Sequence, residues 1–351
     1  MTPRLLAFVA ALVAALAPLA GCDFEPALDI DLPEHTPATV INAVLAADSV
    51  AVVRLDVSTD PYVLGDGRPG RTVEGATVTL LRDGRLVEPL ALQSRRCGTD
   101  DGRPDGPGGT ECGPFVGTVP VEAGGRYTVR AEVPGLPTAE GTVTIPRRPV
   151  VTAEEVGTTG QGRRQLRVRV QDPAGRGDRY GLSLLQGGRR QTFPICDRQT
   201  EPPTCRDTTV VEPRRPVAFS SADPVLLAAE RSLDLGDNTF GFVTVTDASF
   251  DGRTWAFTMT EVPSFYYGRG RPSDGYALTV QVAALSGDVY DAHQILTFGG
   301  QDTENPFIEP VNLPSNVTGG YGLVGGIALA EVTFAAPAET PAARVARRAR
   351  R

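Results

Sequence analysis

The sequence predicts a mainly β protein: an N-terminal immunoglobulin-like or transthyretin-like sandwich, followed by a second β-rich domain with one or two short helices. Apolar residues recur with a period of two over many short runs, which places alternate side chains in a core and in water. Turn formers are frequent, with 39 Gly and 30 Pro among 351 residues, and aromatic residues make up only 6%. This combination is typical of short antiparallel strands joined by tight turns.

An apolar leader precedes the predicted domains. Residues 5–19 are almost entirely Ala, Leu and Val, a stretch of about fifteen residues that suits a signal peptide and is too short to span a bilayer. The motif Leu19-Ala20-Gly21-Cys22 follows and resembles the lipobox of bacterial lipoproteins. We expect residues 1–21 to be a lipoprotein signal peptide and Cys22 to carry acyl chains such as palmitate, several of which hold a protein firmly in a membrane. A secretory signal with a chance Cys is the alternative.

A polar tether is expected over residues 22–37, because an anchored domain needs a spacer to clear the membrane. Five acidic residues crowd this stretch: Asp23, Glu25, Asp29, Asp31 and Glu34. Acids directly after a lipidated Cys act as a surface-export signal in some didermal bacteria, and a solvated linker is the alternative reading. The sequence leaves open whether the anchored domain faces the periplasm or the cell surface.

The first domain is predicted over residues 38–146. Tyr127, Val129 and Ala131 alternate with polar neighbours, as do the apolar residues near 53–57 and 76–80. Turn signals separate the runs at Gly65-Asp66-Gly67, Asp83-Gly84, Gly124-Gly125 and Pro134-Gly135. About seven strands of this kind are typical of a sandwich.

The second domain is predicted over residues 152–334, after a Pro- and Arg-rich linker at 146–151. Strands are expected at 166–170, 180–185, 240–246, 254–261, 276–284 and 327–334. Asp223-Pro224 predicts the start of a helix reaching Arg231, with Asp as N-cap and Pro at the first helical position. Ser286 is predicted to cap a second helix through Leu296. Residues 335–351 lack core-forming side chains and are expected to be a disordered Arg-rich tail.

Four cysteines remain once Cys22 carries lipid, and four allow three disulfide connectivities. The local set, Cys97–Cys112 with Cys196–Cys205, is the simplest because each pair brackets one polar loop. Disulfides require an oxidising compartment, in agreement with export. Zinc is the alternative, but no CxxC pair exists and the chain has only His35 and His293.

Charge and motif content narrow the function classes. The chain holds no Lys, 34 basic residues and 42 acidic ones, and five of its Arg lie in the last eight residues. An acidic body argues against nucleic acid as a partner. No GxSxG motif accompanies His293, and Asp291 is two residues away on a helix, where side chains do not face each other. The sequence therefore predicts no enzyme and no catalytic residues.

One acidic loop suggests a weak calcium site. Asp100, Asp101 and Asp105 lie with Gly102 and Gly106 inside the Cys97–Cys112 bracket, and carboxylates on a sharply turned loop suit Ca²⁺. The distal Glu of an EF-hand loop is missing, so a solvated, disulfide-pinned loop is the default and no metal or cofactor is assigned.

Several blocks occur together in a fixed order. They are Val73-Glu74-Gly75-Ala76-Thr77-Val78, Gly125-Arg126-Tyr127-Thr128-Val129, Phe250-Asp251-Gly252-Arg253-Thr254-Trp255, the strand-to-helix unit 276–296, Asn305-Pro306-Phe307, and the loop from Leu313 through Asn316 to Tyr321-Gly322. With the lipobox, this order resembles a family of Bacteroidota cell-envelope lipoproteins, domain-of-unknown-function family 4249, over most of residues 22–334. The two Cys-bracketed loops and the Arg-rich tail depart from the family.

The resemblance implies an outer-membrane lipoprotein, often encoded near TonB-dependent receptors, and no known reaction. We therefore expect a non-catalytic binding or accessory module, anchored by lipid and docking on an outer-membrane receptor protein. An envelope hydrolase of glycans or peptides and a purely structural lipoprotein are the alternatives. Asn305, Phe307, Asn316 and Tyr321 are candidates for a binding edge, and the backbone needs of a long loop are the competing explanation.

Overall fold

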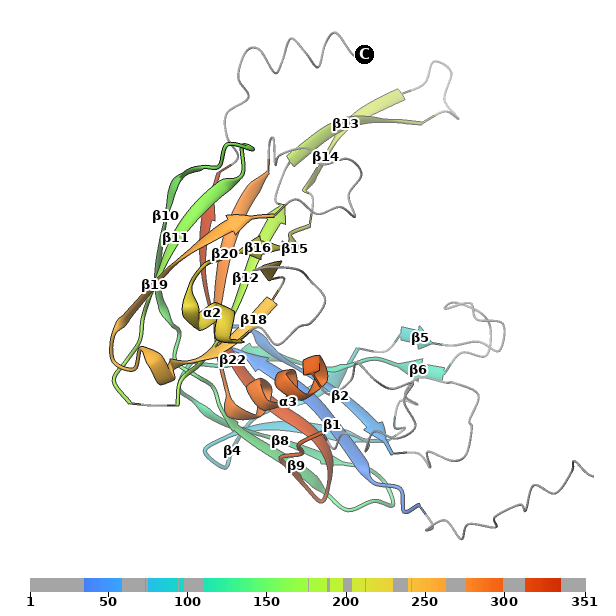
Figure 1. The fold of residues 1–351 in the computed structure, drawn as a ribbon. Coiled ribbons are helices and arrows are strands. Elements are labelled where there is room, and N and C mark those ends of the chain that lie inside the picture. The colour runs from blue at the N-terminus through green and yellow to red at the C-terminus, as the bar shows by residue number, and fades with distance from the viewer. Residues whose placement is uncertain are drawn as a thin grey trace, which may run out of the picture. The chain divides into compact units, whose positions relative to one another are not determined.

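Residues 35–58, 73, 75–93, 95–97, 110–175, 177–187, 190–197, 204–211, 213–229, 239–240, 242–262, 276–298 and 313–335 are described in the computed structural model (Figure 1). The predicted signal peptide, Cys22, nearly all of the tether and nearly all of the Arg-rich tail lie outside these residues. The described residues from Pro37 on belong to one compact unit.

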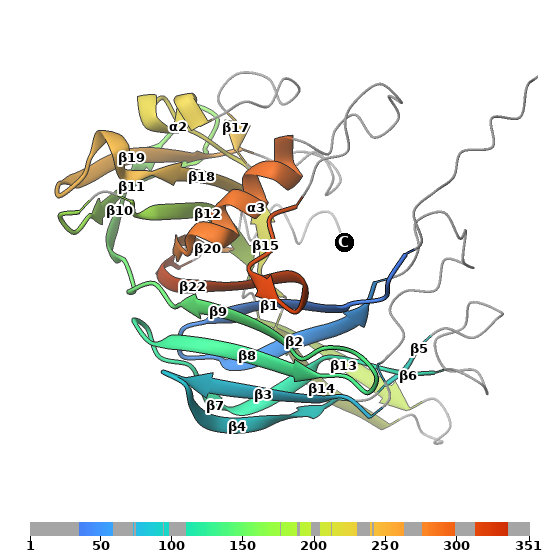
Figure 2. The ribbon, with the colours of Figure 1, turned by 90° about the horizontal axis from the view of Figure 1, so that it is seen from below.

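Strands of the first half enclose a core by folding one long sheet back on itself. They are β1 (Thr39–Ala46), β2 (Val50–Val57), β3 (Thr77–Arg82), β4 (Arg85–Leu92), β7 (Phe115–Pro120), β8 (Arg126–Glu132), β9 (Ala139–Thr144) and β21 (Val317–Thr318). Ile41, Val53 and Phe115 meet Val78 and Val129 in this core. The fold reverses at β4, so β1, β2 and β7 pack against β3, β8 and β9 (Figure 2).

A second core lies between the other end of the same 13-stranded sheet and a separate five-stranded sheet. The elements are β10 (Val150–Thr158), β11 (Arg164–Gln171), β12 (Arg179–Gly187), β15 (Arg215–Val217), β16 (Phe219–Ser220), β17 (Thr239–Phe240), β18 (Phe242–Thr246), β19 (Thr254–Glu261) and β20 (Ala277–Leu285). Trp255 stacks between Phe250 and Phe257 inside it. The predicted fold class, a β-sandwich followed by a second β-rich part with short helices, is confirmed.

The last strand, β22 (Gly320–Phe334), belongs to both halves. Gly320–Ile327 pair in parallel with β1, and Ile327–Phe334 pair antiparallel with β20. The predicted linker at 146–151 lies between the two cores along the chain, yet Val317 and Val324 pack in the first core. The C-terminal strands of the second predicted domain therefore form part of the first core.

Both predicted helices are present. α2 (Pro224–Ala229) begins after Asp223, whose Oδ1 accepts hydrogen bonds from the Val225 N–H at 3.0 Å and from the Trp255 indole at 3.2 Å. α3 (Gly287–Phe298) begins after Ser286, whose carbonyl accepts the first helical bond from Tyr290. The Ser286 hydroxyl accepts a bond from the Gly326 N–H of β22 at 3.1 Å, so this N-cap residue also fastens α3 to the sheet. A 3₁₀ turn, Asp247–Ser249, follows β18.

Two hairpins carry the four predicted disulfide cysteines. In β13 (Arg190–Asp197) and β14 (Thr204–Val211), Cys196 and Cys205 are register partners and form a disulfide, which confirms that pair. In β5 (Arg95–Cys97) and β6 (Thr110–Cys112), Cys97 lies opposite Thr110 and Cys112 opposite Arg95. The side chains of Cys97 and Cys112 lie outside the described part of the structure, so their bridge stays a prediction.

Replacing Gly322 with Ala is expected to destabilise the fold on the order of 3 kcal/mol, by combining backbone strain with overpacking. Gly322 has φ +113°, and a Cβ there would overlap the Ile41 carbonyl of β1. Urea unfolding measures the effect. Gly160→Ala is the control, because no atom lies within 4 Å of a Cβ built at Gly160. Equal stability of the two variants would contradict the tight β1–β22 contact.

Candidate functional site

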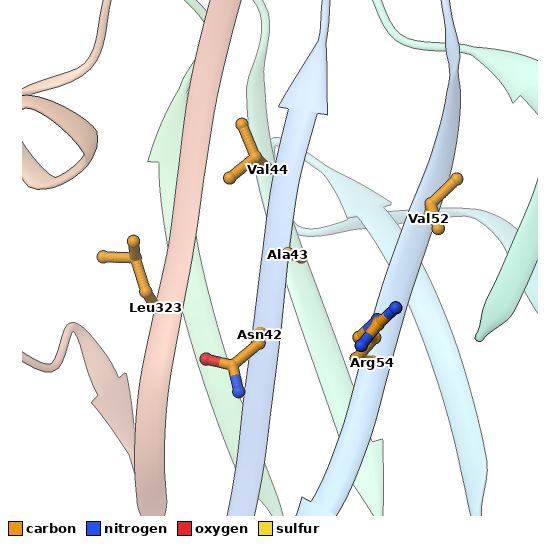
Figure 3. A pocket seen from close by; sticks show the side chains of 6 residues that line it. All are labelled: Asn42, Ala43, Val44, Val52, Arg54 and Leu323. Carbon is orange, nitrogen blue, oxygen red and sulfur yellow. The ribbon is translucent and has the colours of Figure 1, made fainter. Parts of the chain in front are cut away.

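The outer face of β22, β1 and β2 is the candidate binding surface. Along β1, Ile41, Ala43 and Leu45 point into the first core, so Val40, Asn42 and Val44 point outward. The register sets Asn42 between Leu323 of β22 and Arg54 of β2. We call this surface the open face and define it by Asn42, Val44, Val52, Arg54, Tyr321 and Leu323. Five of these six line the groove shown in Figure 3.

Apolar side chains dominate the open face although it is exposed. Tyr321 is 56% exposed, Val44 46% and Val52 45%. Val52 is paired with Val116 of β7, and Val116 with Ala91 of β4, so an apolar row continues across neighbouring strands. Among the described elements, β2 makes its substantial contacts with β1 and β7 alone. The row is therefore left without a covering layer by the described residues.

The outer face of β8, by contrast, is polar. β8 presents Arg126, Thr128 and Arg130 outward, and its Thr128 and Arg130 bond to Thr142 and Glu140 of β9. β1 instead reads as a nearly continuous apolar run, a pattern typical of strands buried on both sides, whereas β2 is apolar up to Val53 and then alternates with Arg54 and Asp56. The open face is thus more apolar than the outer face of β8.

A groove of about 350 Å³ runs over β1 on the open face. Asn42, Ala43 and Val44 of β1 line it between Leu323 of β22 on one side and Val52 and Arg54 of β2 on the other (Figure 3). Among the described residues, the Asn42 amide has no hydrogen-bond partner and the Arg54 guanidinium has no ion pair. Burial raises the pKa of neighbouring Asp56, and the positive charge of Arg54 partly offsets this rise. The groove therefore offers aliphatic contacts beside an amide and one cation.

Two predicted binding-edge residues fall within the described chain, with different roles. The Asn316 side-chain nitrogen donates to the Val324 carbonyl at 2.8 Å, and the Val324 N–H donates to Asn316 Oδ1 at 2.9 Å. Both ends of this amide are occupied in holding β22, which is a structural role. Tyr321 pairs with Val40 and lies on the open face. Asn305, Phe307 and the calcium candidates Asp100, Asp101 and Asp105 lie outside the described residues.

A second cluster, of three carboxylates, was not anticipated from the sequence. Asp172, Asp178 and Asp247 bring one carboxylate oxygen each within 4.8 Å of one another. Asp172 and Asp247 are buried, whereas Asp178 is half-buried. Oxygen ligands at this spacing are the kind that Ca²⁺ and Mg²⁺ accept. The signal in the sequence is a pair of acid-bracketed turns, 172–178 and 247–251, which meet only in the folded chain.

Hydrogen bonds within the fold account for the two buried carboxylates. Asp172 accepts from the Tyr180 hydroxyl at 2.6 Å and from the Gly252 N–H at 2.8 Å. Asp247 accepts from the N–H groups of Gly177 and Asp178. These bonds join two loops, so Asp172 and Asp247 serve as structural acceptors.

In the described part of the chain, no hydrogen bond to the Asp178 carboxylate offsets its burial. Burial raises the pKa of Asp178, and the charges of Asp172, Asp247 and Asp251 raise it further. The pKa of Tyr180 is raised as well, by burial first and then by its hydrogen bond to Asp172. The ionised Asp178 carboxylate is therefore a source of repulsion in the folded state.

Asp178→Asn is expected to raise the melting temperature at pH 7 by about 1–2 °C, because it removes that repulsion. The folded-state pKa of Asp178 is raised, so ionisation costs stability above this pKa, and the gain should shrink as the pH falls below it. Calorimetry at pH 7 and pH 4 checks this. The exposed Asp291→Asn is the control. A lower melting temperature at pH 7 would instead mean that a cation is held by the three carboxylates.

His293 is embedded in the packing of α3. Its ring nitrogens lie 3.4 Å from the hydroxyls of Thr244 and Thr297, and the Phe242 ring meets it edge-on at 4.9 Å between centroids. Burial lowers the pKa of His293. In the described part of the chain no carboxylate bonds to His293, which therefore contributes to the contact between α3 and β18.

Comparisons with known proteins add little to this geometry. No protein-family model matches the chain, and no curated protein matches its sequence. Among solved structures, the full-length major pilin SpaD from Corynebacterium diphtheriae is 13% identical, with 88% of this chain and 68% of the pilin covered and a TM-score of 0.19. A TM-score this low does not establish a common fold or function. Within the described residues, no helix is long and apolar enough to cross a bilayer.

Proposed function

We propose that this protein is a lipid-anchored, non-catalytic binding module of the outer membrane. Lipidation at Cys22 follows from the lipobox, and the resemblance to the Bacteroidota envelope lipoproteins supports a role as accessory to an outer-membrane receptor protein. The observation that carries the binding role is the open face. An apolar surface of this kind, with Tyr and Arg at its border, has the composition of a protein-interaction site.

A protein partner suits the open face better than a glycan does. Val44, Val52 and Leu323 offer aliphatic area, and Tyr321 is the one aromatic ring among the six residues that define the face. Aliphatic rows gain free energy by burial against other apolar surface, at about 25 cal/mol per Å². Polar sugars would not provide the apolar surface that these rows need for burial. The partner is therefore expected to present apolar side chains.

Val52→Asp is expected to weaken partner binding at least tenfold, because burying an unpaired carboxylate against apolar surface is costly. The assay is a pull-down from detergent-solubilised outer membrane of the native host, with quantitative mass spectrometry of the captured proteins. A stoichiometric receptor protein should bind the unaltered chain and be depleted with the variant.

Val150→Asp is the matched control. Val150 is a 60% exposed valine on the edge strand β10, in the other sheet. Both variants should keep the melting temperature of the unaltered protein, since neither changes a core residue. Equal capture by the Val52 and Val150 variants would exclude the open face as the binding surface.

A further inference from the structure

We infer that the Cys196–Cys205 disulfide is a site of thiol–disulfide exchange, and that its reduction releases the β13–β14 hairpin while both cores stay folded. The inference goes beyond the proposed binding function and does not depend on the open face. Three features carry it. The hairpin is a sheet of its own, the bridge joins facing positions of its two strands, and both cysteines are exposed.

The hairpin is inserted between two strands that pair with each other. The chain leaves β12 at Gly187 and enters β15 at Arg215, yet Gln186 and Arg215 are register partners in the long sheet. A Cβ built at Gly187 would lie 2.7 Å from the Pro213 carbonyl oxygen. The outgoing and returning chains are therefore in contact at the base of the insertion.

This base is held without the hairpin. Leu184 of β12 pairs with Val217 of β15, and the Arg214 guanidinium forms an ion pair with Glu331 of β22 at 2.6 Å. Among the elements that the structure describes, neither β13 nor β14 makes substantial contacts with a third element. Loss of order in the hairpin therefore leaves the β12–β15 pairing and the second core in place, which is a local unfolding event.

The strand pairing of the hairpin gives it little stability of its own. An isolated two-stranded hairpin is marginally stable at best in water. Pro194, within β13, lacks a backbone N–H, and Pro is depleted in strands. A disulfide stabilises mainly by restricting the unfolded chain, and this one joins facing residues nine positions apart. The bridge is therefore the main source of order in the hairpin.

The bridge lies where an external thiolate can reach it. The side chains of Cys196 and Cys205 are both exposed. Exchange requires access of the attacking thiolate to a sulfur atom, and exposed disulfides are more readily reduced than buried structural ones. The same bond that orders the hairpin is thus open to a reductant.

The co-reactant is a dithiol, such as an oxidoreductase with a Cys-x-x-Cys pair. One of its thiolates attacks the Sγ of Cys196 or Cys205, the S–S bond breaks, the other cysteine leaves as a thiolate, and a mixed disulfide forms. The second thiol of the donor then attacks the mixed disulfide and releases the first cysteine. The donor becomes a disulfide, while Cys196 and Cys205 gain its two electrons and its two protons.

Hydrogen–deuterium exchange on the full mature protein in lipid nanodiscs tests the inference, with dithiothreitol as the dithiol. The Cys97→Ser, Cys112→Ser variant is used so that dithiothreitol acts on one bridge alone. After reduction, backbone amides of β13 and β14 should exchange at least tenfold faster, whereas those of β12, β15 and β19 should not change. Alkylation of Cys196 and Cys205, followed by mass spectrometry, shows that the bridge opened in the folded protein.

A second comparison needs no reductant. The Cys196→Ser, Cys205→Ser variant should match the reduced protein in the exchange of β13 and β14, and it should keep the melting temperature of the unaltered chain. This comparison also decides the matter if the Cys97→Ser, Cys112→Ser variant does not fold.

Three results would overturn the inference. The first is unchanged exchange of β13 and β14 once the bridge is open, and the second is a bridge that dithiothreitol does not open while the cores are folded. The third is equal acceleration in β12 and β15, which would make the bridge part of the stability of the second core. None of these results bears on receptor capture or on its loss with Val52→Asp, so the proposed function is tested separately.

Discussion

The fold depends on the pairing of one strand, β22, with two partners of opposite direction. Its first half runs parallel to β1, from the start of the described chain, and its second half runs antiparallel to β20. Ile327 is the register partner of both Ala46 and Leu285, so the change of partner occurs at one residue. Since each core packs against part of this strand, neither sandwich is completed until the C-terminal segment is in place.

Small residues make this arrangement possible. At Gly320 and Gly322 a Cβ would overlap carbonyl groups of β1, and at Gly325 it would overlap Val289 of α3. The same strand thus brings a parallel neighbour and a helix close to its backbone. The amide of Asn316 fixes the strand further by bonding to both polar groups of Val324. Asn316, a candidate binding-edge residue in the sequence, therefore has its side chain occupied by a backbone contact.

Local chemistry made much of the fold predictable. Alternation identified β8, β11 and β19, Asp223-Pro224 and Ser286 marked the two helix starts, and a short loop paired Cys196 with Cys205. Contacts between distant segments were not predictable in the same way. The β1–β22 pairing joins residues some 280 positions apart on the chain, and the Asp172–Asp247 contact joins two separate turns. The open face did leave a signal in β1, because residues 39–46 form a nearly continuous apolar run and lack the alternation seen in β8.

The two ends of the long sheet differ in what covers their outer face. α3 reaches from Gly325 of β22, against Val289, to Thr244 of β18, against His293, so it crosses the strands that lie between them (Figure 2). Beneath it, the outward-facing Ala283 and Leu285 of β20 are buried. Val44 and Val52 have the same aliphatic character, yet they lie on the side of β22 that α3 leaves bare. Since one half of this sheet binds a helix of its own chain through such residues, an added layer is the simplest physical reason for the same residues on the other half.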